Sequence, residues 1–393
     1  MKEITRLNVG PVRSLFALVV MSGFLFGQSG SSTHAAVGGK VRAWGQNTSG
    51  ELGIDNLDEK HSPITVHNLD GVKRIDAGCG FALALKNNGT VRAWGDNNDG
   101  QLGNGDQPND ADLPSVVQGL DNVVALAGGY THSLALKKNG RVMAWGSNTH
   151  GELGDDNAPT GTDVPQPVPN LDNVKAITAG THVSLALKQN GTVRSWGYNS
   201  DGQLGNGDAP NDKAHPVKVK KLDDVIAIAT GCSGYTMAAL RRNGTVWAWG
   251  YNSSGEIGDG SLDQRNVPVK VVQLNDVKAI AGGYQQLMAL KENGTVWAWG
   301  ENQDGQLGDG TTVDKPVPVR VERLKSVKAI AMGDYTGYAL KKDGTVRAWG
   351  DNSDGELGNN DAPNDRTHPV KVLNLSGITH ISAGSETAYA LKK

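Results

Sequence analysis

Short apolar runs alternate with glycine-rich and polar turns along most of the chain, and the same order returns about every fifty residues. In one copy, residues 123–127 form an apolar run that ends before two glycines, which is typical of a buried strand followed by a turn. A second strand is predicted over 133–137. The Asn139-Gly140 pair after it predicts a tight hairpin, because both residues of such a turn need positive φ. The pattern therefore predicts short antiparallel strands.

The second half of the same copy completes a four-stranded unit. A third strand is predicted over 141–145, and a long polar loop follows it. The fourth strand, predicted over 164–168, contains two prolines, which cannot donate to a sheet ladder and so belong on an edge. We therefore expect the fourth strand to be the outermost strand of its sheet.

Two sequence landmarks each occur seven times. One is a Trp-Gly pair, whose tryptophans are spaced by 50, 51, 51, 53, 50 and 50 residues: Trp44, Trp94, Trp145, Trp196, Trp249, Trp299 and Trp349. The other is an Ala-Leu run that ends at Leu85, Leu136, Leu187, Leu240, Leu290, Leu340 and Leu391. A buried tryptophan removes about 150–250 Å² from water. We expect these seven to be packing wedges between neighbouring units rather than platforms for sugars.

Seven four-stranded antiparallel units predict an all-β, seven-bladed β-propeller. The chain enters the pattern at 39–44, which reads as a third strand, and ends at 390–393, which reads as a second strand. We expect the N-terminal third and fourth strands to pair with the C-terminal first and second strands. Such pairing closes the ring and removes its open sheet edges. Residues 36–393 are predicted to form this single domain.

Residues 1–35 read as a secretory signal peptide. Lys2, Arg6 and Arg13 form a basic start, and the apolar stretch 15–26 is too short to span a bilayer comfortably. Small residues at 35–36 offer a cleavage site; an uncleaved membrane anchor is the alternative. We expect a secreted, extracellular monomer that is free of the membrane after cleavage.

Charge and cysteine content narrow the function classes. The net charge is −3, and removal of residues 1–35 takes away three basic residues and one acidic residue, leaving −5. Binding to nucleic acid needs clustered Lys and Arg, so no nucleic-acid partner is expected. Cys79 and Cys232 occupy equivalent places in non-adjacent repeats. Because a disulfide needs Cα atoms within about 7 Å, we expect two free, buried thiols.

The repeat has a family signature in residues 91–103, in the near copy at 299–308 and in the half-repeat 127–136. These stretches resemble the regulator-of-chromosome-condensation repeat, and the resemblance covers residues 39–393. It implies a seven-bladed propeller, in agreement with the repeat count. The eukaryotic namesake is a guanine-nucleotide exchange factor for a small nuclear GTPase. This chain departs from it in its signal peptide and in lacking a basic tail.

A secreted bacterial relative in the same family is the β-lactamase-inhibitor propeller, which binds its target through loops on one face. The chain is similar to it in starting near a third strand and ending on a second. The loops between third and fourth strands are longer in this chain than in the inhibitor, so the resemblance does not by itself imply inhibition. It does imply a secreted bacterial protein.

No catalytic motif is found, and we expect no catalytic residues, no cofactor and no metal. His132 and His182 fall in adjacent repeats and could bind a metal with a carboxylate, but hydrogen-bonded turn histidines are the preferred interpretation. Asp-Gly loops could hold calcium. Their spacing puts glycine where an EF-type loop needs a ligand, and Asn and Asp before Gly are ordinary turn formers.

In a four-stranded meander the first-to-second turn and the third-to-fourth loop lie on the same face. That face is predicted to be acidic, and the hairpin turns of the opposite face carry Lys and Arg. Acidic loops with aromatic side chains suit a protein-binding site. The expected partner-binding residues are Phe81, Tyr130, His132, Tyr198, Tyr235, Tyr251, Tyr284, Tyr335, Asp96, Asp99, Asp304 and Asp354. The alternative is that the tyrosines only plug the channel.

The sequence therefore predicts a non-enzymatic, secreted protein that binds another protein through its acidic, tyrosine-bearing face. An enzyme inhibitor of the β-lactamase-inhibitor type is one version of this hypothesis. A guanine-nucleotide-exchange-factor-like regulator of a GTPase is the alternative, and a carbohydrate-binding or enzymatic propeller is a third.

Overall fold

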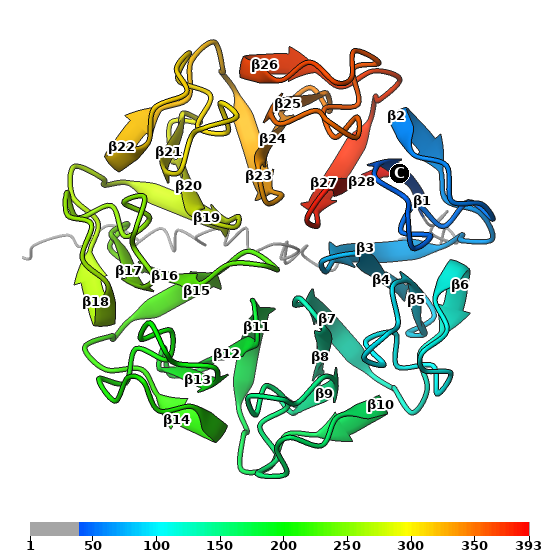
Figure 1. The fold of residues 1–393 in the computed structure, drawn as a ribbon, viewed down its shortest axis with the longest axis vertical. Coiled ribbons are helices and arrows are strands. Elements are labelled where there is room, and N and C mark those ends of the chain that lie inside the picture. Colours follow the sequence, from blue (N-terminus) through cyan, green and yellow to red (C-terminus); the bar gives the residue numbers. More distant parts are fainter. Residues whose placement is uncertain (1–38, 393) are drawn as a thin grey trace, which may run out of the picture.

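The computed structural model describes residues 39–392, which form a ring of seven four-stranded antiparallel sheets (Figure 1). The ends of the first strands line a central channel. The predicted signal peptide lies outside the described residues. We number the blades in chain order from β3. Within residues 39–392 no helix is long and apolar enough to cross a membrane. The all-β, seven-bladed fold predicted from the repeat is confirmed.

The first four blades follow one another without interruption. Blade 1 contains β3 (Val72–Ala77), β4 (Phe81–Lys86), β5 (Val91–Gly95) and β6 (Ala111–Val116). Blade 2 contains β7 (Val123–Gly128), β8 (His132–Lys137), β9 (Val142–Gly146) and β10 (Thr162–Pro167). Blade 3 contains β11 (Val174–Ala179), β12 (Val183–Lys188), β13 (Val193–Gly197) and β14 (Lys213–Lys218). Blade 4 contains β15 (Val225–Ala229), β16 (Thr236–Arg241), β17 (Val246–Gly250) and β18 (Arg265–Lys270).

The last three blades include the one in which the two ends of the chain meet. Blade 5 contains β19 (Val277–Gly282), β20 (Gln286–Lys291), β21 (Val296–Gly300) and β22 (Lys315–Arg320). Blade 6 contains β23 (Val327–Met332), β24 (Thr336–Lys341), β25 (Val346–Gly350) and β26 (Arg366–Lys371). Blade 7 contains β27 (Ile378–Ala383), β28 (Thr387–Lys392), β1 (Lys40–Gly45) and β2 (Lys60–Thr65).

In blades 1 to 6 the strands run outward from the channel in chain order, and in blade 7 the order is β27, β28, β1 and β2, so the fourth strand of the repeat is always the outer edge (Figure 1). The proline-bearing strand β10 lies at this edge of blade 2, as predicted from its missing amide donors. The predicted second and third strands of this blade are correct to within one residue at their ends.

Ring closure follows the predicted scheme. Blade 7 has the strand order β2-β1-β28-β27, and the N-terminal strand β1 pairs with β28 along its whole length, with Val41 opposite Leu391. Because strands from both ends of the chain share this sheet, neither β1 nor β28 has an unpaired edge at the junction. The chain ends therefore hold the ring together through backbone hydrogen bonds.

The seven landmark tryptophans are fully buried, which confirms that they are packing wedges. Each indole nitrogen also donates a hydrogen bond to a backbone carbonyl oxygen of the preceding blade, as Trp94 Nε1 does to Glu51 at 2.7 Å. The other pairs are Trp145–Gln101, Trp196–Glu152, Trp249–Gln203, Trp299–Glu256, Trp349–Gln306 and Trp44–Glu356. The acceptors are the Glu and Gln residues of the Gly-Glu/Gln-Leu/Ile-Gly loops, so each tryptophan fixes a loop of its neighbour. A fully buried tryptophan cannot stack on a sugar.

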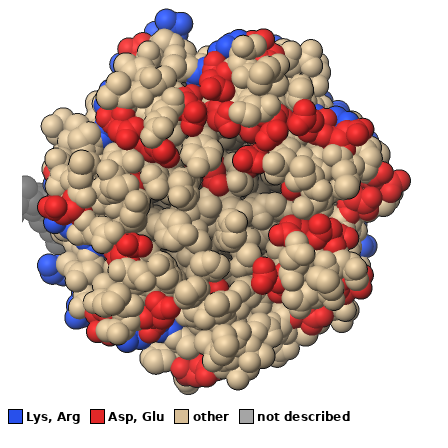
Figure 2. Space-filling view, viewed as in Figure 1, with Lys and Arg blue, Asp and Glu red and all other residues tan. Residues whose placement is uncertain are grey.

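The turns after the first strands and the loops after the third strands lie on one face. In blade 1, the Asp96 amide donates to the Gly80 carbonyl oxygen at 2.8 Å, which joins the third-strand loop to the first-to-second turn. We call this face the loop face. Figure 2 shows acidic side chains spread around the channel on this side of the disc, and basic side chains at its rim.

Candidate functional site

Aromatic rings form a continuous chain around part of the channel mouth on the loop face. Adjacent ring centroids lie 4.8–6.3 Å apart, at mostly edge-to-face angles that aromatic pairs prefer. We call this set the aromatic arc, and its members in spatial order are Tyr130, His182, His150, Tyr198, Tyr235, Tyr284 and Tyr335. Tyr251 branches from it, 6.4 Å from Tyr235.

The arc is assembled from two kinds of loop in five blades. Tyr130, His182, Tyr235, Tyr284 and Tyr335 come from the first-to-second turns of blades 2 to 6. His150 and Tyr198 follow third strands, as does Tyr251. Tyr130 is 46% exposed and the other members of the arc are half-buried, so the rings form part of the surface.

Hydrogen bonds hold the two histidines of the arc. His182 Nδ1 lies 3.1 Å from Oε1 of the buried Glu152, and His150 Nδ1 lies 2.9 Å from Asp212. Burial alone would raise the pKa of Glu152, but the hydrogen bond with His182, the His132 charge and backbone hydrogen bonds together lower it. Residues 150 and 182 were not among the predicted binding residues, because they lie fairly far apart in sequence and meet only where blades 2 and 3 adjoin.

Carboxylates continue the rim of the mouth beyond the last tyrosine. We call them the acidic crescent, and they are Glu301, Asp304, Asp351, Asp354 and Glu386. Burial, then the charges of neighbouring carboxylates, raises the pKa of Glu301 and of Glu386 to about 7. After burial, the Asp351 charge raises the pKa of Asp304, and the charges of Glu59 and Asp351 raise the pKa of Asp354. The crescent therefore carries mutually repelling negative charge.

The acidic crescent is not neutralised by basic side chains. Within residues 39–392, none of its five members forms an ion pair with Lys or Arg. On the opposite face, hairpin cations are paired with aspartates of the inter-blade connections, in Lys137–Asp121, Lys188–Asp172 and Arg241–Asp223. Aspartates in the third-to-fourth loops of the loop face are paired as well, in Lys213–Asp208, Arg265–Asp259 and Lys315–Asp309, so the lack of a cation partner is particular to the crescent.

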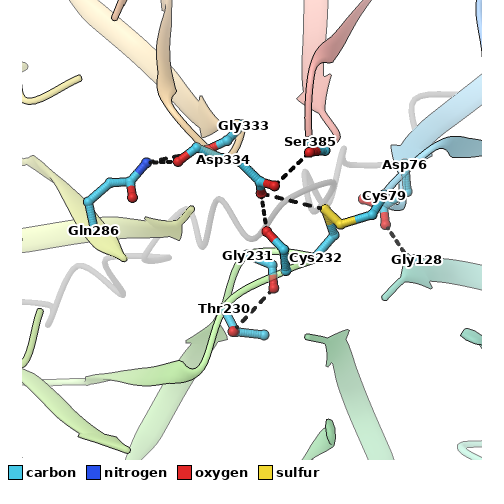
Figure 3. The surroundings of a disulfide bond; sticks show 11 residues. Asp76, Cys79, Gly128, Thr230, Gly231, Cys232, Gln286, Gly333, Asp334 and Ser385 are labelled. Carbon is cyan, nitrogen blue, oxygen red and sulfur yellow. Dashed lines mark hydrogen bonds between the residues drawn. A yellow bond between two sulfur atoms is a disulfide. The ribbon is translucent and has the colours of Figure 1, made fainter. Parts of the chain in front are cut away.

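The prediction of two free thiols is wrong. Cys79 and Cys232 form a disulfide with a Cα–Cα distance of 5.6 Å, at the centre of the ring (Figure 3). They belong to blades 1 and 4, which are not neighbours. The first strands converge on the axis, so turns of distant blades approach one another there.

A longer turn in blade 4 brings its cysteine to the axis. Six residues separate β15 from β16, whereas three separate β3 from β4 in blade 1. The extra length accounts for the 53-residue spacing between Trp196 and Trp249. That spacing was the signal in the sequence that could have indicated an unusual turn.

A buried carboxylate fixes the disulfide-bearing turn from the opposite side of the channel. Asp334 accepts hydrogen bonds from the hydroxyl groups of Ser233 and, at 2.6 Å, Ser385 (Figure 3). Burial raises the pKa of Asp334, and these two hydrogen bonds oppose that shift. The turns of blades 4, 6 and 7 are thereby joined next to Tyr235, Tyr335 and Glu386.

Two of the predicted partner-binding residues lie in the interior. Phe81 is fully buried because it is the first residue of β4, and its ring packs against the backbone of Gly78. His132, the equivalent first residue of β8, is also fully buried, with Nε2 2.8 Å from Ser184 Oγ. Counting back from the Ala-Leu runs would have placed both on strands, one or two positions after the exposed turn residues.

The other predicted residues lie on the loop face. Tyr130, Tyr198, Tyr235, Tyr284 and Tyr335 join the arc, with Tyr251 beside it, and Asp304 and Asp354 join the crescent. Asp99 lies near the opposite end of the arc, where the His182 charge lowers its pKa against the larger effect of burial. Asp96 accepts hydrogen bonds from Asn98 and Gln101 in its own loop.

Metal-ligating side chains converge at one place in the part of the chain that the structure describes. Ligand atoms of Cys79, Cys232 and Asp334 lie within 4.8 Å of one another, but the two sulfur atoms are joined in the disulfide. The carboxylates of the crescent are more widely spread. His132 and His182, considered for a metal from the sequence, instead contact Ser184 and Glu152.

Comparison with known families covers nearly the whole propeller. The profile of the RCC1-like domain matches residues 35–233, and that of the regulator of chromosome condensation (RCC1) repeat matches 243–290, 293–340 and 343–391. The ultraviolet-B receptor UVR8 of Arabidopsis thaliana is 28% identical over 251 residues, which are 62% of this chain and 56% of UVR8. The human probable E3 ubiquitin-protein ligase HERC6 is 36% identical over 163 residues, 40% of this chain and 16% of HERC6. The chain thus spans at most 56% of the length of these relatives.

Solved structures share the fold. Human WBSCR16 superposes with a TM-score of 0.80 at 24% identity, covering 90% of this chain and 99% of WBSCR16. Prp20p of Saccharomyces cerevisiae, described with its binding to Gsp1p and histones, has a TM-score of 0.80 at 23% identity, covering 91% and 92%. At these identities the likeness concerns the fold alone.

Proposed function

We propose that the chain, which belongs to the regulator of chromosome condensation (RCC1) repeat family, is a protein-binding module without enzymatic activity whose partner docks on the aromatic arc. The observation that carries this proposal is the arc itself, a run of partly exposed rings from five blades on one face. Tyrosine supplies large contact area with few rotatable bonds, and it is enriched in the energetic centres of interfaces.

The arc is more than a channel plug. A plug would need only the turn residues that point to the axis, whereas His150, Tyr198 and Tyr251 follow third strands and extend the aromatic surface away from it. Hydrogen bonds hold His150 and His182 in place before any partner arrives, which reduces the entropy lost on binding.

We further propose that the protein is a secreted bacterial monomer that works outside the cytosol. The signal-like sequence at 1–35 and the Cys79–Cys232 disulfide support secretion, since disulfides persist mainly in oxidising compartments. Inhibition of an enzyme, as in the β-lactamase-inhibitor propeller, is one way in which such a binding face would act.

A GTPase regulator is the second candidate function, and the fold likeness to Prp20p, with its binding to Gsp1p, favours it. It requires a cytosolic or nuclear location, which the signal-like sequence and the disulfide argue against. The ligase activity in the names of the HERC relatives belongs to proteins of which this chain matches about one sixth.

Affinity capture tests the proposal. The purified chain is immobilised and compared with the variant Tyr130→Ala/Tyr284→Ala/Tyr335→Ala. A control variant, Lys138→Ala/Arg242→Ala/Lys342→Ala, removes three exposed side chains from hairpin turns of the opposite face. Circular dichroism first establishes that all three proteins are folded.

We expect a protein that is retained by the wild type and the control and lost from the tyrosine variant. Retention of the same proteins by all three would contradict docking on the arc. Accelerated release of fluorescent GDP from purified small GTPases would instead support the second candidate.

A further inference from the structure

The partner's chemistry can be inferred from what lies beside the aromatic arc, and this step rests on the proposed function. We propose that the partner presents an extended basic segment, rich in Lys and Arg, which lies across the tyrosines and onto the acidic crescent. The arc supplies aromatic faces for the cations, and the crescent supplies their counter-charge.

The arc and the crescent form one continuous rim. Tyr335 and Glu386 occupy the same position in the first-to-second turns of blades 6 and 7, directly after Asp334 and Ser385. The Asp334 amide donates to the Ser385 carbonyl oxygen at 3.0 Å, which ties the two turns together. Burial, followed by the charges of Glu301 and Asp334, raises the pKa of Tyr335 to about 12. The last rings of the arc therefore lie within the electric field of the carboxylates.

The crescent has negative charge that the described residues leave uncompensated. Its five members have no Lys or Arg partner within 39–392, while three aspartates of the opposite face each have one. The His61 charge lowers the pKa of Asp354 less than burial and the other carboxylates raise it, and His61 is itself paired with Glu59 at 2.8 Å. An external cation would relieve this repulsion.

Beneath the crescent, two buried carboxylates have an oxygen without a hydrogen-bond partner. Glu256 and Glu356 are 0% and 1% exposed, and Oε1 of each is unpartnered. The Glu301 charge raises the pKa of Glu256, and the Asp351 and Asp354 charges raise that of Glu356, in both cases after burial. These couplings place both groups on the same side of the mouth as the crescent, where an external cation would also stabilise their charged forms.

A basic peptide fits this arrangement better than a single metal ion. An ion such as Ca²⁺ needs several oxygens that converge at about 2.3–2.6 Å from it. Within residues 39–392 the one set of three metal-ligating groups that converges is the disulfide pair with Asp334, so the crescent carboxylates do not. Separate carboxylates spread along a rim match the spaced cations of an extended chain. Arg and Lys also bind favourably over tyrosine faces.

The test uses the full purified chain and a fluorescent peptide of about twelve residues in which Arg and Gly alternate, about 40 Å long when extended. A Glu-Gly peptide of the same length is the control ligand. Binding is measured by fluorescence anisotropy at about 50 mM and about 200 mM salt, since screening weakens contacts between exposed charges.

Two charge variants distinguish binding at the crescent from non-specific attraction of the peptide to an acidic protein. Glu301→Gln/Asp351→Asn/Glu386→Gln removes three of the five carboxylates of the crescent, and Asp121→Asn/Asp172→Asn/Asp223→Asn removes three carboxylates from the opposite face. We expect the crescent variant to weaken Arg-peptide binding about tenfold or more, at about two- to threefold per lost charge pair, and the control to change it less than about twofold. The variant Tyr130→Ala/Tyr284→Ala/Tyr335→Ala should also weaken it.

Other outcomes overturn the inference. Equal affinity for the Arg and Glu peptides would do so, as would equal loss in the two charge variants. Calorimetric binding of about 1 mM Ca²⁺ that depends on the crescent, without peptide binding, would assign a metal site instead. If a partner is captured through the arc but the Arg peptide does not bind, the proposed function is supported and the inference of a basic segment in the partner is wrong.

Discussion

The indole nitrogen of Trp44 donates a hydrogen bond to the backbone carbonyl oxygen of Glu356, at 2.7 Å, across the junction between the two ends of the chain. The same carbonyl oxygen accepts a hydrogen bond from the Tyr338 hydroxyl at 2.8 Å. Trp44 is the counterpart of the six other wedges, but it lies on the N-terminal strand, so it holds the ring closed as well as packing two blades together.

Replacement of Trp44 with Ala should destabilise the protein by about 3–5 kcal/mol, the usual cost of deleting a buried aromatic side chain. The change should also raise the rate of proteolysis within β1, because the closing strand loses its wedge. Urea denaturation and limited proteolysis measure the two effects. Trp247→Ala is the matched control, because the Trp247 side chain is only half-buried, with the Arg241 guanidinium over its ring, so its removal should cost less. Equal losses in both variants would contradict a special role at the junction.

Loss of the disulfide should lower stability by about 2–5 kcal/mol. The bond closes a loop of 153 residues, and the loss of loop-closure entropy in the unfolded chain corresponds to about 5 kcal/mol in the simplest treatment. Guanidinium unfolding with and without reductant measures this difference. The variant Cys79→Ser/Cys232→Ser should match the reduced wild type and show no response to reductant. The prediction would be wrong if the unfolding midpoint of the wild type were the same with and without reductant.

Glu356→Gln should stabilise the protein at pH 8 and leave it unchanged at pH 5. Burial and the charges of Asp351 and Asp354 raise the pKa of Glu356 to about 8. The folded state therefore favours the protonated form, and stability is lost as pH rises from the ordinary pKa of the carboxyl towards 8. Gln is accommodated at this position, because Gln101, Gln203 and Gln306 occupy it in other blades.

Thermal unfolding of the Glu356→Gln variant and the wild type at both pH values measures this effect, with roughly 2–4 °C expected per kcal/mol relieved. Asp343→Asn is the control, since the pKa of this exposed hairpin carboxyl is lowered and its neutralisation should not stabilise at pH 8. A stabilisation of Glu356→Gln that is the same at pH 5 would show that charge is not the cause.

Affinity for the Arg-Gly peptide should rise between pH 6 and pH 8. The pKa values of Glu301 and Glu386 are raised to about 7, so these carboxyls gain negative charge over this interval. The groups that raise them, besides burial, are Asp304 and Asp314 for Glu301, and Asp354, Asp334, Asp351 and Glu51 for Glu386. Anisotropy titrations at each pH measure the change, and Glu301→Gln/Glu386→Gln should flatten it. A decline in wild-type affinity over this range would contradict the assignment.

The propeller could be predicted from sequence because its signals are local and repeated. Alternation of apolar residues sets the strands, Asn-Gly pairs set the hairpins, and proline marks the outer strand β10. The site was predicted only in part. The tyrosines were found because they lie in glycine-rich turns, whereas Phe81 and His132 were misplaced, since one or two positions separate an exposed turn residue from a buried strand residue.

The sequence by itself thus determined the number of blades, their strand order, the wedge tryptophans and the face that carries the loops, since each depends on neighbours along the chain or on an exact repeat. Tertiary structure alone decided which turns meet at the axis and at the mouth. The Cys79–Cys232 bond and the His150–His182 contact join residues of different blades. Their proximity depends on how closely the first strands converge and on the greater length of one turn, and repeat spacing contains no measure of that distance.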